Sequence, residues 1–322
     1  MQPAPGAGAG TAGAHSRRRD AGGRPKVAIT LGDPRGIGPE VVARALADFG
    51  NAGADLHVVG PTGTEVIPHT STGTWLPHGG APLAGELAGV AIERAVEMAL
   101  SGEVDGIVTA PIDKAALLAG GYSYPGHTEM LAALTGSRTA MMLASDRLRV
   151  VLATTHIPLR DVVHDLTMDL IERTATITRA GLASWFGIDN ARIALCALNP
   201  HAGDGGRFGS EDDVILRPAA AKAGLLGPFS ADTVFVRAMR GEFDAVIAPY
   251  HDVGMTAIKV ASFGSAVNVT LGLPFPRTSP DHGTALDIAG KGIADASSMI
   301  TAIRMCLAIV ERQMATRASR AT

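Results

Sequence analysis

The chain has few cysteines and no long apolar run. Only Cys196 and Cys306 occur among 322 residues, and each lies in an apolar stretch. Two distant thiols in apolar surroundings are typical of buried, reduced cysteines, which argues against a disulfide framework and favours a cytoplasmic location. No run of about 18 apolar residues could span a bilayer. The first residues also lack the apolar core of a secretory signal, so we expect neither membrane insertion nor export.

A strong charge of one sign is also missing. The formal net charge is -3, which excludes a bulk attraction to nucleic acid or to an anionic membrane. Basic groups that bind a phosphate must therefore act locally. With 46% hydrophobic residues, the chain can bury a sizeable core, and its length suggests two lobes. Residues 1–24 are rich in Gly, Ala and Pro without periodicity, which predicts a disordered tail.

From Lys26 onward, short apolar runs typical of strands alternate with helical patterns. The predicted strands are residues 26–31, 55–60, 106–111, 148–155, 191–198, 245–250 and 266–272, and the clearest helical periods are residues 86–100 and 169–185. Such alternation predicts an α/β fold with a largely parallel sheet.

Three histidines stand at or after the ends of apolar runs that read as buried strands. They are His156 in VVLATTHIP, His201 in IALCALNPHAG and His251 in AVIAPYHD. Side chains at the carboxyl ends of strands face the ligand crevice of an open α/β sheet, and neutral imidazole binds divalent metals. The repetition favours one metal site. Any one of them alone could be an ordinary hydrogen-bonded imidazole, because no compact metal signature is present.

Several segments are suited to binding an anion. The turn GDPRGIGPE (32–40) lets the backbone approach a ligand, and His127 and Thr128 follow a glycine before a helical stretch. A structural turn and a helix cap remain alternatives for these two segments. Lys259, Asn268 and Arg277 follow at intervals of nine residues, and together they suit a small acid that carries phosphate or carboxylate.

The order of the motifs resembles one enzyme family. The succession GDPRGIGPE, PIDK, PGHTE, TTHIPL, LNPHAGDGGRFGSED, YHD and NVTLGLPFPRTSPDHGTALDIAGKGIAD, within Val27 to Ile309, is similar to the 4-hydroxythreonine-4-phosphate dehydrogenases, the PdxA-type enzymes of vitamin B6 synthesis. The resemblance implies a two-lobed α/β/α fold like that of isocitrate and isopropylmalate dehydrogenases, with a central cleft. Residues 25–130 together with 270–322 would form the cofactor lobe, and residues 131–269 would form the lobe for metal, substrate and dimer contacts.

The resemblance also implies the site. A homodimer would carry its active site at the subunit interface, with one divalent ion (zinc, magnesium or cobalt) bound by the three histidines His156, His201 and His251. The expected substrate contacts are His127, Thr128, Lys259, Asn268 and Arg277, and NAD or NADP would lie near Gly272, His282, Gly283, Thr284 and Asp287. Lys259 and Asp252 are the candidate catalytic residues. Asp252 could orient His251 or accept a proton.

The implied reaction is the NAD- and metal-dependent oxidation of 4-phosphohydroxy-L-threonine. Its 3-oxo acid product would lose carbon dioxide to give 3-amino-2-oxopropyl phosphate, a step of pyridoxal phosphate biosynthesis. Two residues depart from the family pattern: Val253 replaces the usual glutamine, and Arg35 replaces a small residue. They leave D-threonate or D-erythronate 4-phosphate as the alternative substrate. A metal-dependent hydrolase and a catalytically silent phosphate-binding protein are the hypotheses from other classes.

Overall fold

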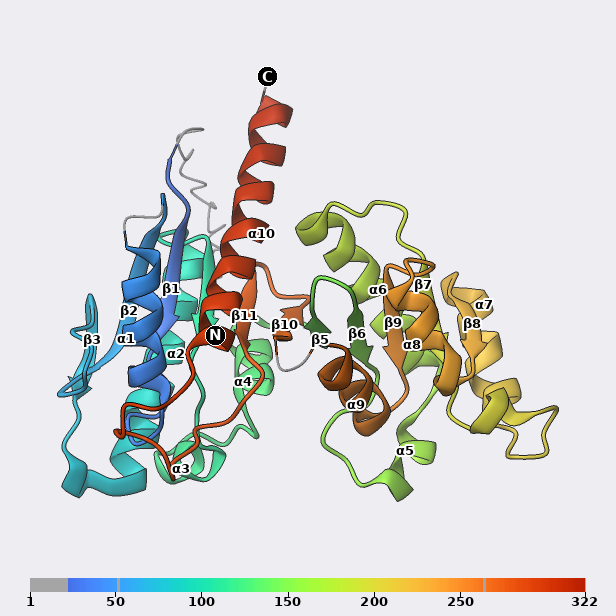
Figure 1. Ribbon diagram of the computed structural model, residues 1–322, viewed down its shortest axis with the longest axis horizontal. Coiled ribbons are helices and arrows are strands. Elements are labelled where there is room, and N and C mark those ends of the chain that lie inside the picture. The colour runs from blue at the N-terminus through green and yellow to red at the C-terminus, as the bar shows by residue number, and fades with distance from the viewer. Residues whose placement is uncertain (1–22, 51–52, 263–264, 322) are drawn as a thin grey trace, which may run out of the picture.

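The strands form one continuous mixed sheet. The computed structural model describes residues 23–50, 53–262 and 265–321, so most of the predicted tail lies outside the described residues. Eleven described strands pair in the spatial order β3 (Thr70–Thr74), β2 (Asp55–Thr62), β1 (Lys26–Thr30), β4 (Gly106–Thr109), β11 (Arg277–Pro280), β10 (Val267–Leu271), β5 (Ala140–Ala144), β6 (Arg149–Leu152), β9 (Ala245–Ala248), β7 (Ile193–Cys196) and β8 (Leu226–Phe229). Figure 1 shows the two halves of the molecule on either side of β10 and β5.

The sheet is parallel except at its centre. Strand β10 is antiparallel to both β11 and β5, and β5 is antiparallel to β6. The other neighbouring strands run parallel. The predicted α/β fold with a largely parallel sheet is therefore confirmed. All seven predicted strands are present, while β3, β5, β8 and β11 were not predicted.

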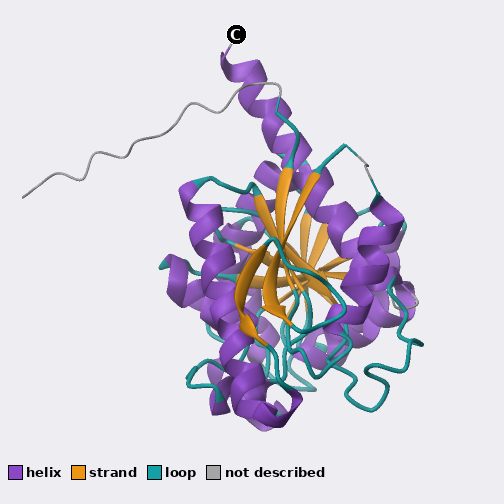
Figure 2. Cartoon of the chain, turned by 90° about the vertical axis from the view of Figure 1, so that its left-hand side faces the viewer, coloured by secondary structure: helices purple, strands orange, loops and turns teal. Residues whose placement is uncertain are grey.

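Helices cover both faces of the sheet (Figure 2). They are α1 (Gly38–Phe49), α2 (Gly80–Ser101), α3 (Lys114–Ala119), α4 (His127–Thr135), α5 (Leu159–Asp165), α6 (Met168–Phe186), α7 (Arg217–Ala223), α8 (Ala231–Met239), α9 (His251–Ser262) and α10 (Ser297–Ala321), with short turns of other helix types at Pro77–Gly79, Pro200–Gly203 and Asp212–Leu216. Within the described part of the chain, none of these helices is long and apolar enough to cross a membrane.

The sequence explains where the second predicted helix begins and ends. The Thr167 hydroxyl accepts a hydrogen bond from the Leu170 amide at 3.2 Å, which caps the first turn of α6. Gly187 ends the helix in the left-handed conformation that favours glycine. Between these caps, Ile171, Leu182 and other apolar side chains are buried against the sheet.

The core consists of one large apolar cluster and a smaller second one. The smaller cluster lies in the half of the sheet that contains β6, β9 and β7, under α8 and α9. Cys196 belongs to it and Cys306 to the larger cluster. Both are buried free thiols, which confirms the prediction about their state.

The predicted lobe boundaries fall inside secondary structure. Position 130/131 lies within α4, and position 269/270 lies within β10. The division into lobes stays a prediction. The sheet nevertheless places β10 and β5 at the centre of the molecule, where the two halves meet.

Candidate active site

A pocket of about 400 Å³ opens where the two halves meet. Seven of its residues were predicted as substrate or cofactor contacts: His127, Thr128, Lys259, Asn268, Arg277, His282 and Gly283. The predicted metal ligand His156 also lines it. Lys114, Glu129 and Asp281, for which the sequence predicts no role, line it too.

Arg277 is the most deeply buried charge of the pocket. It begins β11 and is 2% exposed. Its Nη1 donates to the Thr270 hydroxyl at 3.0 Å, and its Nη2 donates to the Thr109 hydroxyl. Burial lowers the pKa of Arg277 to about 9, and the nearby Glu129 carboxylate opposes that shift. The guanidinium therefore remains charged at neutral pH and is held by neutral groups, so its charge is available to an anion.

His127 stands beside that charge at the start of α4. Burial, and then the Arg277 charge, hold the pKa of His127 well below 6.5, so the imidazole is neutral. Gly126 precedes it as the helix N-cap, without a side-chain cap. The first amides of a helix have no intrahelical acceptor, and they attract anions together with the helix dipole.

Lys259 approaches the pocket from α9. Its Nζ lies 3.3 Å from Oδ2 of Asp281, which is only 14% exposed on its side chain. Burial raises the pKa of Asp281, and the Lys259 ammonium partly reverses that shift. This ion pair joins α9 to the segment that follows β11, so it connects the predicted substrate and cofactor regions.

Unpaired buried polar atoms gather around this pocket. Among the described residues, His127 Nε2, Asn268 Oδ1, Arg277 Nε and His282 Nε2 are buried without a hydrogen-bond partner, and all four residues line the pocket. Buried polar groups are nearly always paired in native proteins. Donors and acceptors left open at one cavity indicate a polar ligand.

The three predicted metal ligands follow three adjacent strands but do not all meet. His156 comes after β6 and His251 after β9, and their ring centroids are 5.5 Å apart. The His251 Nδ1 lies 2.7 Å from Oδ1 of Asp252, which leaves its Nε2 free. His201 follows β7 and instead packs against Phe208, with 6.4 Å between ring centroids. No group of three or more potential metal ligands forms within the part of the chain that the structure describes.

The backbone around His201 is strained. His201 has a φ of 53°, and the neighbouring Ala202 and Asp204 have φ values of 54° and 45°. Residues other than glycine seldom adopt this left-handed conformation, and such strain concentrates at functional sites. The loop therefore presents the His201 imidazole in a conformation that the surrounding structure must enforce.

Asp212 supplies part of that enforcement. Its side chain is fully buried, and its two oxygens accept hydrogen bonds from the amides of Leu198 and Asn199 at 2.8 and 2.9 Å. The Asn199 side chain in turn donates to Glu211 Oε2 at 2.8 Å. A carboxylate fourteen residues away in the sequence thus holds the start of the loop that carries His201.

The predicted cofactor segment lies against the Gly-rich turn. The Ile37 amide donates to the Thr284 carbonyl at 2.9 Å, and a Cβ on Gly36 would lie 2.8 Å from the same oxygen. Only glycine permits this approach. Asp287 is exposed. Gly272 has a φ of 92° in the turn after β10, against the Arg138 carbonyl, and neither it nor Asp287 nor Thr284 lines the pocket.

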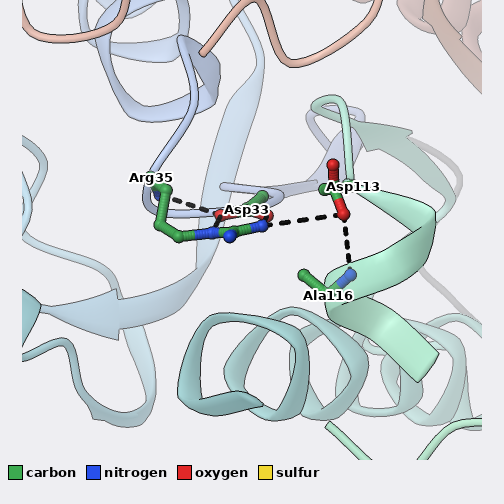
Figure 3. Close-up of polar contacts among 4 residues, drawn as sticks. All are labelled: Asp33, Arg35, Asp113 and Ala116. Atoms are coloured by element: carbon green, nitrogen blue, oxygen red, sulfur yellow. Dashed lines mark hydrogen bonds and ion pairs between the residues drawn. The ribbon is translucent and has the colours of Figure 1, made fainter. Parts of the chain in front are cut away.

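The two departures from the family pattern lie outside the pocket lining. Arg35 forms a double hydrogen bond with the buried Asp33, with Nε and Nη2 at 3.1 and 2.7 Å from its two oxygens. Its Nη2 is also 3.7 Å from Asp113 Oδ1, as Figure 3 shows. Val253 is partly buried on α9 and packs against the smaller apolar cluster. Arg35 is therefore held by an ion pair, and Val253 by apolar packing.

The fold is also found in isocitrate dehydrogenase. The isocitrate dehydrogenase of Methylococcus capsulatus is 17% identical to this chain and superposes with a TM-score of 0.50, over 92% of this chain and 89% of that one. The structure thus confirms the predicted isocitrate dehydrogenase-like fold. At this identity the likeness shows the fold alone, and the activity and the family follow from closer relatives.

The family model described as "Pyridoxal phosphate biosynthetic protein PdxA" matches residues 54–306, and the chain belongs to this family. The 4-hydroxythreonine-4-phosphate dehydrogenase of Desulfosudis oleivorans is 42% identical, over 88% of this chain and 96% of the relative. A crystal structure of that enzyme from Klebsiella pneumoniae gives a TM-score of 0.79 at 38% identity, over 89% of this chain and 98% of that one. A Salmonella typhi relative, named for a proposed D-threonate 4-phosphate dehydrogenase activity, is 41% identical, over 87% of this chain and 98% of the relative.

Proposed function

We propose that this dehydrogenase oxidises 4-phosphohydroxy-L-threonine with NAD, and that the 3-oxo acid then loses carbon dioxide to give 3-amino-2-oxopropyl phosphate. The observation that carries the proposal is the set of unpaired atoms of His127, Asn268, Arg277 and His282 around one pocket. The phosphate and carboxylate of such a substrate offer oxygens to the donors among these atoms, and its hydroxyl and ammonium groups offer hydrogens to the acceptors. The names of the relatives from Desulfosudis oleivorans and Klebsiella pneumoniae support the same substrate.

His156, which lines the pocket, and the neighbouring His251 fit a divalent metal. His156 and His251 are neighbouring imidazoles, and Asp252 holds one nitrogen of His251. Burial lowers the pKa of His156, which favours the neutral form that metals require. Zinc, cobalt or magnesium bound there would supply a Lewis acid for the secondary hydroxyl of the substrate. His201 would complete the set from a second copy of the chain.

The protein's own groups then have distinct tasks. Arg277, His127 and Asn268 would bind the phosphate, and the Lys259 and Asp281 pair would border the reacting carbons. Asp252 would fix the imidazole of His251, as carboxylates beside metal ligands commonly do. The segment with His282 and Gly283 would place NAD against the open side of the pocket.

The homodimer belongs to the same proposal. One chain brings His156 and His251 together but holds His201 elsewhere. Exposed apolar side chains lie near both groups in the sequence, with Leu159 66% exposed and Phe208 50% exposed. A second copy that covers these residues would remove them from water. NAD rather than NADP, and a cytoplasmic location, stay predictions.

A substrate panel tests the function. We expect NADH formation with 4-phosphohydroxy-L-threonine, abolished by a chelator and restored by a divalent ion. Faster turnover of D-threonate or D-erythronate 4-phosphate would favour the alternative substrate, and the name of the Salmonella typhi relative supports the first of these two acids. Phosphate release without NADH formation would indicate a hydrolase instead. Turnover that survives both the chelator and His201→Ala would contradict the metal proposal.

A further inference from the structure

Lys114 is a charge in the pocket that has no ion-pair partner among the residues that the structure describes. Three cations and two carboxylates line the pocket, namely Lys114, Lys259, Arg277, Glu129 and Asp281. Lys259 is paired with Asp281. Among the described residues, none forms a salt bridge or hydrogen bond with the Lys114 ammonium. Lys114 thus supplies the net positive charge of the lining, which would be electrically neutral without it.

The position of Lys114 places this charge beside the start of α4. Its Cε lies 3.6 Å, and Glu129 Oε2 lies 3.4 Å, from the point that a Cβ on Gly126 would occupy. Gly126 is the N-cap of α4, a nine-residue helix whose first amides have no intrahelical acceptor. Arg277, which is almost completely buried, lines the same pocket with an unpaired Nε. An ammonium, a guanidinium and a helix N-terminus therefore border one pocket, together with the Glu129 carboxylate.

The backbone before Lys114 is held firmly. Asp113 Oδ1 accepts a hydrogen bond from the Ala116 amide at 2.7 Å, which caps α3, and Arg35 approaches the same oxygen at 3.7 Å (Figure 3). The Asp33 amide donates to the Pro111 carbonyl at 3.0 Å. The Gly-rich turn thus fixes the backbone that carries Lys114, and a backbone that is already ordered loses less freedom when the residue binds a ligand.

We propose that Lys114 is a further substrate-binding residue, which binds the phosphate group of the substrate together with Arg277 and the first amides of α4. The assignment rests on the proposed function for the identity of the substrate. A phosphate dianion needs more than one cation for tight binding, and Lys259 is already neutralised by Asp281. Arg35 and Asp113 act as positioning residues that hold Lys114 in place.

Lys114→Met tests the assignment, because methionine keeps the apolar stem and removes the charge. With 4-phosphohydroxy-L-threonine and NAD, we expect KM for the acid to rise about 10- to 100-fold, as for loss of one charge-assisted hydrogen bond. The kcat and the KM for NAD should change little, because the contact is made equally in ground and transition states. Lys114→Arg should recover part of the loss. Lys222→Met is the matched control, since Lys222 forms a surface ion pair with Glu172.

A second measurement does not depend on turnover. Inorganic phosphate should raise the thermal midpoint of the full-length wild-type protein and of Lys222→Met, but raise that of Lys114→Met much less. If no acid phosphate is oxidised, the proposed function fails, and this shift still decides the role of Lys114. Equal shifts in both lysine variants, or no shift in the wild type, would overturn the assignment. So would an equal rise in KM with the substrate's unphosphorylated analogue, because that would place the contact elsewhere.

Discussion

Asp212 gives the sharpest test of how the His201 loop is held. Asp212→Ala removes both acceptors of the Leu198 and Asn199 amides, which are bonded at 2.8 and 2.9 Å. A hydrogen bond to a charged group contributes roughly 1.5–3 kcal/mol, so the loss of two should lower the free energy of unfolding by about 3–6 kcal/mol. Asp212→Asn keeps one acceptor and turns an NH₂ group toward the other amide, so about half of that loss should remain.

The neighbouring Asp213 provides the matched control. It is exposed, and its Oδ1 accepts from Nε and Nη2 of Arg217 at 3.1 and 3.0 Å. Such exposed pairs contribute about 0.3–0.5 kcal/mol, so Asp213→Ala should be nearly neutral. Urea denaturation of the four proteins gives the comparison. The reasoning would be refuted if Asp212→Ala were within about 1 kcal/mol of the wild type, a smaller loss than even one such bond supports.

The loop also links this prediction to the proposed metal. Because Asp212 fixes the start of the segment that carries His201, we expect Asp212→Asn to weaken divalent-ion affinity about 10-fold or more. Titration of the metal-free protein with zinc or cobalt measures this. An unchanged affinity together with lower stability would mean that Asp212 supports the fold but not the site.

Three further substitutions address other parts of the site. Gly36→Ala would place a Cβ 2.8 Å from the Thr284 carbonyl, so KM for NAD should rise severalfold, and an unchanged value would contradict the placement of the cofactor. His127 has a pKa well below 6.5 in the folded chain, so the unfolded state binds more protons and stability falls as pH drops below about 6.5. His127→Gln should make this decrease of the unfolding free energy with falling pH shallower, by up to about 1.4 kcal/mol per pH unit. Urea denaturation at several pH values measures the slope. The same slope in the variant and the wild type would argue against a buried neutral imidazole. Arg35→Ala leaves the buried Asp33 carboxylate without its ion pair and should lower the free energy of unfolding by about 3 kcal/mol. Adding Asp33→Asn to this variant should recover part of the loss. If Arg35→Ala left the stability unchanged, the ion pair would not be needed.

Two of the unpredicted strands, β3 and β11, have sequences without an apolar pattern typical of a strand. Strand β11 has the sequence RTSP, yet all four residues are buried. Its polar groups are bonded across the fold, with Arg277 donating to hydroxyls on β4 and β10 and the Thr278 hydroxyl donating to the Ala302 carbonyl at 2.8 Å. Such partners are supplied by distant segments, so the local sequence does not reveal them. Strand β3 is an exposed edge with no apolar alternation at all.

The candidate site, like the fold, could be predicted from the sequence only in part. The rule for strand ends located the histidines, because β6, β9 and β7 are neighbours in a parallel array. It did not reveal that His201 packs against Phe208 and does not join His156 and His251 within one chain, since that depends on the conformation of a long loop. Lys114 and Asp281 were missed because the pocket lining depends on side-chain directions. An aspartate directly before a helix that begins with lysine was the local signal for Lys114.

The continuous sheet bears on how the protein unfolds. Five residue pairs connect β10 and β5 in an antiparallel register from Val267 and Ala144 to Leu271 and Ala140. The two halves therefore share backbone hydrogen bonds at the centre of the molecule, and neither can lose its central strand without exposing an edge of the other. The pocket residues at this seam are thus ordered only when both halves are folded. We expect a single cooperative unfolding transition, in which ligand binding at the seam stabilises the whole chain and not one half.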